Sequence, residues 1–307
     1  MYTPVKPQSP AQKSLLGDYL GFLKHPEMSP LNLKTRDIIS HIWRLYTGHL
    51  VLMVPMLVII RLISPLISGI EENKISDLME TVPIYQMIFL AVVMAPLAEE
   101  LIFRLPLKFR GRNFAIPLGI LCFTIGGNLL PLTERPLFSL ACLFGLMLVA
   151  IQGPLMLCRA ITKPKGDAFF AKYLALLVFG SSIVFGAVHI TNYPISAWMA
   201  APILVLPQTT LGVLLAYVRL KFGYWWAVLT HGLHNLLITS PLMFVAFGSE
   251  QLKQKFLDQA KDVAVLPQDR VVEGLLVVWT LVMLALIVRT AVKLVLEWKQ
   301  ARTATAS

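Results

Sequence analysis

Eight apolar stretches, each long enough to cross a bilayer as a helix, constrain the fold of this 307-residue chain. A membrane-spanning helix needs about 20 predominantly apolar residues. Hydrophobic residues make up 56% of the chain and charged residues 14%, whereas soluble domains carry about 25% charged residues. We therefore expect an all-α, polytopic transmembrane bundle. The predicted spans are 45–69, 83–105, 114–131, 137–158, 173–192, 197–218, 224–247 and 271–295.

The basic residues between these stretches predict their orientation. Nineteen of the 27 Lys and Arg side chains lie in one set of alternate loops, and six lie in the other. Cytoplasmic loops carry an excess of Lys and Arg, so both termini are expected in the cytoplasm. The net charge of +10 then faces the anionic headgroups of the cytoplasmic leaflet. This distribution argues against a nucleic-acid partner.

The chain divides into a cytoplasmic tail at 1–44, a transmembrane bundle at 45–295 and a second cytoplasmic tail at 296–307. The first forty residues contain no long apolar run, so no cleavable signal peptide is expected. Apolar residues at helical spacing over 11–24 favour a helix on the membrane surface, with a disordered tail as the alternative. The three cysteines have no paired spacing, which argues against a zinc knuckle or a disulfide framework.

Two adjacent carboxylates, Glu99 and Glu100, lie inside the second stretch. Ionisable groups in a membrane helix are costly and mark function or a buried ion pair. Glu100 and Arg104 are four residues apart, so they share a helix face and can pair. Glu99 points about 100° away and has no such partner, which leaves it free to act as a base.

Two further stretches carry histidines. His189 follows Phe185 by four residues, and His231 precedes Asn235 by the same spacing, with His234 on a neighbouring azimuth. A single membrane histidine is usually a satisfied core residue. A glutamate pair, several histidines and an amide in one bundle can instead activate water or stabilise an oxyanion.

The three segments together resemble the CPBP family of membrane proteins, which includes the type II CAAX prenyl endopeptidases and many bacterial relatives. The resemblance rests on Glu99-Glu100 followed by Arg104, on Phe185 to His189, and on His231 to Asn235. It covers 83–108 and 180–240, which we expect to form a protease-like core. The 84 residues between Arg104 and His189 exceed the usual separation in that family and predict an added helical hairpin.

The resemblance implies an intramembrane endopeptidase that cleaves a membrane-associated or lipidated protein, located in a bacterial plasma membrane. In such an enzyme Glu99 activates water and His189 orients it. His231 and Asn235 stabilise the oxyanion. Glu100 and Arg104 position the site, Phe185 packs against it, and His234 supports it. Glu99 and His231 each lie about eight residues from the cytoplasmic boundary, whereas His189 follows Lys172 by 17 residues. His189 can reach the same depth in the membrane only if the fifth helix is tilted or begins later than Lys172.

The sequence alone leaves two questions open. The first is the cofactor, which is either zinc, with Glu99, His189 and His231 as candidate ligands, or no metal at all. Zinc needs three protein ligands in a catalytic site, and these three would come from three helices. The second is activity, since a silent family member that acts as a binding or immunity protein, or more remotely a proton-coupled transporter, would carry similar residues.

Overall fold

The computed structural model of the chain describes residues 14–67, 82–129, 136–161, 163–249, 251–252, 255 and 266–306. Within these ranges all regular structure is helical, as the apolar stretches predict. Residues 1–13, which include the start of the predicted surface helix at 11–24, lie outside the described ranges. The remainder of that segment forms α1 (Leu15–Lys24), which Ser14 caps by accepting a hydrogen bond from the Gly17 N–H at 3.1 Å.

Five of the described helices are long and apolar enough to cross a membrane. A sixth candidate is bent by 47° between Leu204 and Leu206. The predicted spans at 83–105 and 114–131 do not meet the same test, because the first is interrupted and the second is short. The five are α2 (Thr35–Ile63), α7 (Pro136–Ala160), α8 (Lys163–Val188), α11 (Tyr224–Ala246) and α13 (Asp269–Ala306).

The shorter segments complete the bundle. The interrupted span consists of α4 (Ile84–Phe89), the π-helix η2 (Leu90–Met94) and α5 (Ala95–Phe103). It continues into the 3₁₀ turn η3 (Leu105–Leu107) and α6 (Gly111–Leu129). The bent span consists of η5 (Ile195–Ala200), α9 (Ala201–Leu204) and α10 (Leu206–Lys221). Two small 3₁₀ turns, η1 (Ser64–Leu66) and η4 (His189–Asn192), follow α2 and α8.

Two helices begin earlier than the apolar stretches indicate. The structure begins α2 at Thr35, where the stretch begins at 45, and begins α8 at Lys163, where the stretch begins at 173. The added turns carry charged residues such as Arg36 and Asp167. A search for apolar runs excludes these turns, although a helix can continue past the hydrocarbon into the polar interface.

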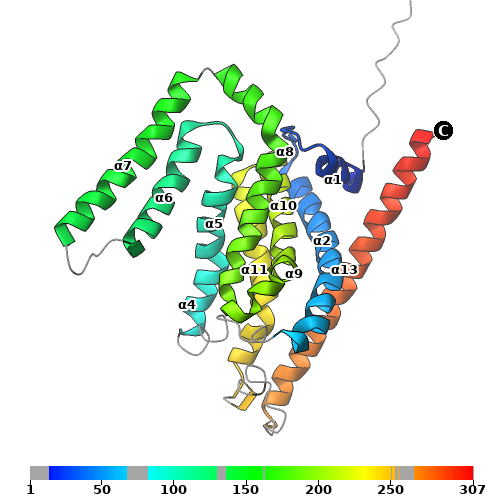
Figure 1. The fold of residues 1–307 in the computed structure, drawn as a ribbon. Helices are drawn as coiled ribbons and strands as arrows, with labels where there is room; N and C mark the ends of the chain where they lie inside the picture. The colour runs from blue at the N-terminus through cyan, green and yellow to red at the C-terminus, as the bar shows by residue number, and fades with distance from the viewer. Residues whose placement is uncertain are drawn as a thin grey trace, which may run out of the picture.

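The helices form one main bundle with a hairpin leaning away from it (Figure 1). In the bundle α8 packs on α10, α10 on α11 and α2, and α13 on α2. The hairpin is made of α6 and α7, which pack along one another, and it occupies the sequence between Arg104 and His189. The hairpin predicted from that long separation is therefore present.

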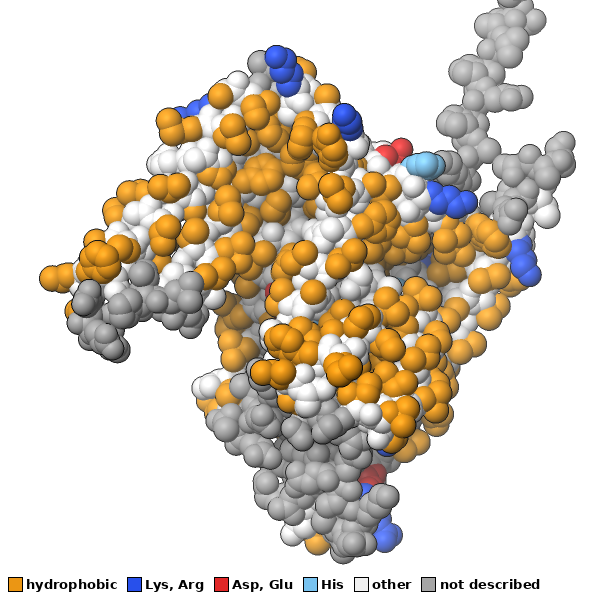
Figure 2. Space-filling view, in the orientation of Figure 1, with side chains coloured by type: hydrophobic (Ala, Val, Ile, Leu, Met, Phe, Trp, Pro, Cys, Tyr) orange, Lys and Arg blue, Asp and Glu red, His pale blue; other side chains and the backbone are white. Residues whose placement is uncertain are grey.

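Apolar side chains cover much of the outer surface (Figure 2). Examples are Leu62 on α2, Val149 on α7 and Leu281 on α13, which are 71%, 73% and 59% exposed. A soluble monomer rarely exposes a large continuous apolar patch. Together with the long apolar helices, this surface identifies the chain as an integral membrane protein.

The core is centred on α10, which is buried on nearly all sides from Leu211 to Lys221. The N-terminal segment covers its last turn. Asp18 of α1 accepts hydrogen bonds from the Tyr217 hydroxyl at 2.7 Å and from the Lys221 ammonium at 3.3 Å. The Lys221 ammonium also lies 2.6 Å from the Ser29 hydroxyl. Lys221 is only 3% exposed, so a lysine predicted to lie in a loop is a buried anchor for the N-terminal segment.

Candidate active site

Pro96 shapes the helix that carries the two glutamates. The N–H of residue 96 would bond the carbonyl of Val92 in an α-helix and that of Ala91 in a π-helix, but proline has no N–H. The helix widens just before it, and the Ala95 N–H bonds the Leu90 carbonyl, five residues back. Such π segments are rare and occur frequently at functional sites. Here the π segment ends five residues before Glu99 and frees backbone carbonyls for contacts from other helices.

Glu100 and Arg104 form the predicted pair on one face of this segment. The Arg104 Nε lies 3.7 Å from the Glu100 Oε2, and both side chains are fully buried. The guanidinium also stacks over the Phe185 ring, 4.3 Å from its centroid. The Arg104 carbonyl accepts a hydrogen bond from Arg219 Nε at 3.0 Å. Arg104 therefore links α5 to α8 through Phe185 and to α10 through Arg219.

Gly212 on α10 makes room for the Arg104 side chain. A Cβ at this position would lie 3.0 Å from Arg104 Nη2 and 3.1 Å from the Cα of Ser182. We expect Gly212→Ala to lower the free energy of unfolding by about 1–3 kcal/mol, the usual cost of overpacking. Gly180→Ala in α8 is the matched control, because a Cβ there meets nothing within 4 Å. Chemical unfolding of both variants in detergent measures the difference, and equal stabilities would exclude crowding at Gly212.

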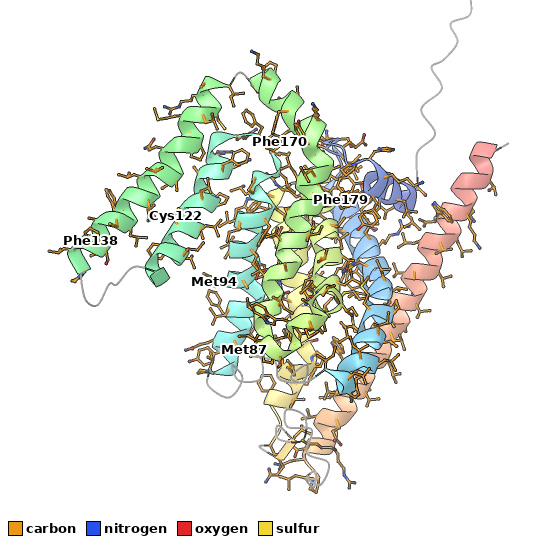
Figure 3. The ribbon with its side chains drawn as sticks, in the orientation of Figure 1. Met87, Met94, Cys122, Phe138, Phe170 and Phe179 are labelled. Atoms are coloured by element: carbon orange, nitrogen blue, oxygen red, sulfur yellow. The ribbon has the colours of Figure 1, made fainter. Side chains whose placement is uncertain are left out.

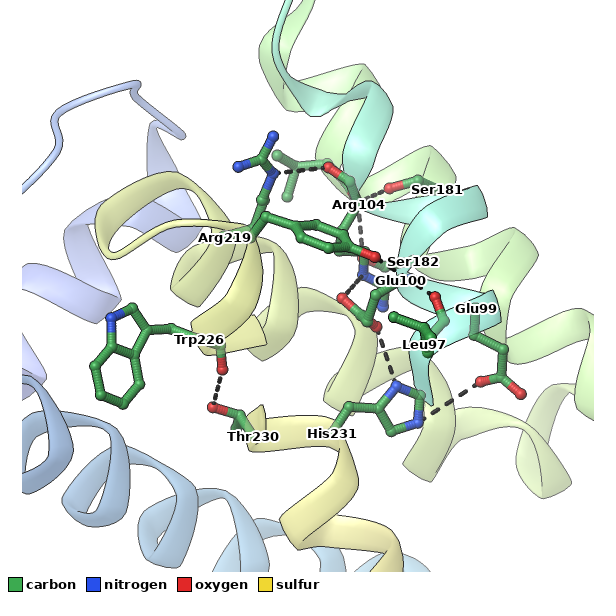
Figure 4. A network of polar contacts seen from close by, with 12 residues as sticks. Leu97, Glu99, Glu100, Arg104, Ser181, Ser182, Arg219, Trp226, Thr230 and His231 are labelled. Carbon is green, nitrogen blue, oxygen red and sulfur yellow. Dashed lines mark hydrogen bonds and ion pairs between the residues drawn. The ribbon is translucent and has the colours of Figure 1, made fainter. Parts of the chain in front are cut away.

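His231 lies between the two carboxylates (Figure 4). Its Nδ1 is 3.1 Å from Glu100 Oε1, and its Nε2 is 3.6 Å from Glu99 Oε2. The Nδ1–H donates to the buried Glu100 carboxylate, which fixes the orientation of the ring. Glu99 differs from Glu100 because 29% of its side chain is exposed. The arrangement joins a buried carboxylate, an imidazole and an accessible carboxylate in one line.

His189 lies near His231, because the Phe185 ring contacts both histidine rings. The Phe185 ring lies 4.8 Å from the His189 ring and 5.6 Å from the His231 ring, centroid to centroid. His189 Nδ1 is 2.8 Å from the Phe185 carbonyl. A carbonyl only accepts hydrogen bonds, so this nitrogen carries the proton and Nε2 is the free acceptor of the neutral ring. Within the described residues His189 makes no hydrogen bond to Glu99 or His231. Of the two alternatives predicted for its helix, the late start is wrong, since α8 begins at Lys163, and the tilt stays a prediction.

Asn235 contacts the π segment. Its Nδ2 donates to the carbonyl of Ala91 at 2.7 Å, the carbonyl whose π-helical donor would be the N–H that Pro96 lacks. The neighbouring carbonyl of Val92 would lie 2.8 Å from a Cβ at Gly232, so α11 approaches this part of the helix closely. The resemblance implies that Asn235 stabilises an oxyanion. In the structure one of its two amide hydrogens holds α11 to η2.

This contact gives a testable result. Asn235→Ala leaves the Ala91 carbonyl without a donor, and we expect the free energy of unfolding to fall by about 1–3 kcal/mol. Adding Pro96→Ala supplies a backbone N–H that lets the helix close normally, so the double variant should recover part of this loss. Unfolding without substrate measures both effects. If Pro96→Ala adds to the loss instead, the account of the break is wrong.

His234 does not join the carboxylates. Its Nδ1 is 3.3 Å from the Tyr46 hydroxyl, and its ring packs edge-on against the Tyr46 ring. The arrangement places His234 one helical turn beyond His231 and toward α2. It fixes α11 against α2, which is consistent with a supporting position beside the site.

Reasoning from the sequence missed three contributors to this site. Arg219 was counted with the loop charges, although it is only 6% exposed and bonds the Arg104 carbonyl. The Tyr224 hydroxyl donates to the Leu97 carbonyl at 3.5 Å, and its ring lies 5.6 Å from the Arg219 guanidinium carbon. Gly212 is the third. The contacts of these three residues join different helices, and no spacing between residues close in sequence indicates such contacts.

The described donor side chains do not form a metal site. Among the described residues no group of three or more His, Cys, Asp or Glu side chains is arranged to hold one. Glu99, His189 and His231, the candidate zinc ligands, do not form such a group. We therefore derive no catalytic step through a metal.

Comparison with known proteins gives one match. A family model described as "Type II CAAX prenyl endopeptidase Rce1-like" matches residues 81–237. This range includes Glu99, Arg104, His189, His231 and Asn235. Neither a curated protein nor a solved structure matches the chain.

Proposed function

Because the chain belongs to the Rce1-like family of type II CAAX prenyl endopeptidases, we propose that it hydrolyses a peptide bond in a membrane-associated or lipidated protein. The observation that carries this proposal is the position of His231 between Glu99 and Glu100, 3.6 and 3.1 Å away. The two carboxylates differ in exposure, which suits them to different roles. The accessible one acts on water, and the buried one holds the imidazole.

The proposed reaction begins with a water molecule beside Glu99. The Glu99 carboxylate takes one proton from the water, and the hydroxyl oxygen attacks the carbonyl carbon of the peptide bond. Negative charge develops on the carbonyl oxygen of the tetrahedral intermediate. Donors aimed at that oxygen stabilise the transition state more than the ground state. His231 Nε2 is the proposed donor, on the ring that Glu100 orients through Nδ1.

The second half of the reaction returns the proton. Protonated Glu99 gives it to the leaving nitrogen, and the C–N bond breaks. The products are a carboxylic acid and an amine, and transfer of the acid proton to the amine gives a carboxylate and an ammonium group. His189 is proposed to orient the water, since its Nε2 is the acceptor left free by the Nδ1 contact to the Phe185 carbonyl. Asn235 has a second amide hydrogen for the oxyanion while its first holds the Ala91 carbonyl.

We further propose that all eight apolar segments traverse the bilayer and that both termini face the cytoplasm of a bacterial cell. The support is the concentration of Lys and Arg in alternate loops. In that orientation Glu99 and His231 lie within the membrane near its cytoplasmic side. A substrate then enters laterally from the bilayer or from the cytoplasm, near the depth of these two side chains.

The decisive experiment is a cleavage assay with the purified protein in liposomes. The substrates are membrane-embedded and lipidated peptides, with the cut site read by mass spectrometry, with and without a chelator. Cleavage that survives the chelator supports the glutamate mechanism, and cleavage restored only by zinc contradicts it. If no peptide is cleaved, while the protein still captures one of them, the silent binding protein replaces the enzyme as the better description.

A further inference from the structure

A groove outside the candidate active site opens between the hairpin and the bundle. It has a volume of about 750 Å³, within the range of about 300–1,000 Å³ typical of ligand sites. Three helices form its walls, namely the first turns of α6, the last turns of α7 and the first turns of α8. Its lining includes Phe109, Phe114, Leu157, Cys158, Lys165 and Phe170.

The packing of the helices holds this groove open. α7 packs along α6, whereas α8 packs on α10, so α7 and α8 diverge from their short connection (Figure 1). The inner wall is aromatic, because the Phe170 ring lies 5.6 Å from that of Phe109 and 5.8 Å from that of Phe114. Figure 3 shows Phe170 on α8 at the side facing the hairpin. A Cβ at Gly166 would overlap the Phe109 ring, so the ring lies directly against α8.

Basic residues are concentrated at the end of the groove where α7 connects to α8. The segments 108–112 and 159–172 contain seven Lys or Arg residues and one acid, Asp167. Lys165 is the only charged side chain among the lining residues. Nearby, burial lowers the pKa of Lys108, and the neighbouring Arg219 and Arg110 lower it further. These cations therefore lie close enough to repel one another.

We infer that this groove binds an anionic phospholipid, with an acyl chain against the phenylalanines and the phosphate at Lys165. An apolar channel that ends at Lys165, which forms no ion pair with the residues that the structure describes, matches an amphiphile with an apolar tail and a negative head. Basic pockets between membrane helices on the cytoplasmic side bind such headgroups. The lipid fills the wedge between α7 and α8 and fixes the hairpin against the bundle. This inference does not depend on the catalytic role of Glu99.

Native mass spectrometry of the full chain in detergent tests the inference. The probes are dioleoylphosphatidylglycerol, which is anionic, and dioleoylphosphatidylcholine, which is neutral overall. The parent should retain the anionic lipid at much lower concentration than the neutral one. Lys165→Glu should weaken retention of the anionic lipid by at least about tenfold, because it reverses one charge at the phosphate. Cys158→Trp should weaken retention of both lipids by filling the groove.

Two matched controls make the result specific. Lys163→Glu reverses a neighbouring charge that does not line the groove, and Met156→Trp places the same ring on the exposed face of α7, where Met156 is 66% exposed. Both should bind lipid like the parent. Three results would each overturn the inference. They are an equal loss of lipid binding in Lys163→Glu, equal binding of the two lipids by the parent, and unchanged lipid binding in Cys158→Trp. A Cys158→Trp protein that keeps the anionic lipid but loses only cleavage of lipidated peptides would assign the groove to the substrate's lipid instead.

Discussion

Glu99→Gln is expected to lower the rate of peptide-bond cleavage by about 10²–10⁴-fold, the usual contribution of a general acid–base group. Glutamine keeps the size of the side chain beside His231, but it cannot accept a proton from water. Since 29% of the Glu99 side chain is exposed, removing its charge should leave the fold and the binding of substrate largely intact. The measurement is single-turnover cleavage in liposomes, with substrate binding determined separately.

The control is Glu273→Gln. Glu273 lies on α13 and pairs with Lys255 at 3.0 Å, away from the candidate active site, so its loss should leave cleavage unchanged. If Glu99→Gln cleaves at the parental rate, Glu99 is not the base and the proposed mechanism fails. If Glu273→Gln loses activity to the same extent, the effect of Glu99→Gln reflects a general loss of charge and not a specific role.

Arg104→Ala should cost about 3–5 kcal/mol in the free energy of unfolding, because it leaves the Glu100 carboxylate buried without its cation. Both partners are fully buried, so water cannot take the place of the guanidinium. The substitution also removes the contact with the Phe185 ring. Yield of folded protein and chemical unfolding in detergent measure this cost, and they require no substrate.

A double variant separates the ion pair from the space that it fills. Glu100→Gln with Arg104→Met removes both charges and keeps most of the volume, so it should be clearly more stable than Arg104→Ala. If Arg104→Ala folds and unfolds like the parent, the pairing contributes nothing to stability. If the double variant is no more stable than Arg104→Ala, the cost of Arg104→Ala does not come from an unpaired carboxylate.

Local spacing was sufficient to predict the helical fold, the hairpin between Arg104 and His189, and the Glu100–Arg104 pair. These features depend on residues close in sequence or on the lengths of apolar runs. The early starts of α2 and α8 could not be found in this way, because their first turns carry charges that resemble loop residues. The count of eight full spans stays a prediction, since among the described helices five, or six with the bent pair, are long and apolar enough to cross a membrane.

The candidate site was predicted as a set of residues but not as a geometry. The sequence placed Glu99 and Glu100 on different faces of one helix, and both still reach His231, because α11 presents the imidazole between them. The contact of Asn235 with the Ala91 carbonyl could not be foreseen, since it requires a π segment caused by Pro96 and a neighbouring helix that meets it. Arg219 likewise takes its position from a partner 115 residues away in sequence.

The contacts of the N-terminal segment have a consequence for the order of synthesis. Asp18 and Tyr217 are 199 residues apart in sequence, and Arg44 pairs with Glu297 across 253 residues. A ribosome therefore releases α1 long before its partner on α10 exists, and α2 long before α13. During translation α1 and α2 therefore lack these native contacts until the intervening helices have been made and inserted. Docking of α1 onto Lys221 thus belongs to the late steps of biogenesis, although α1 is made first.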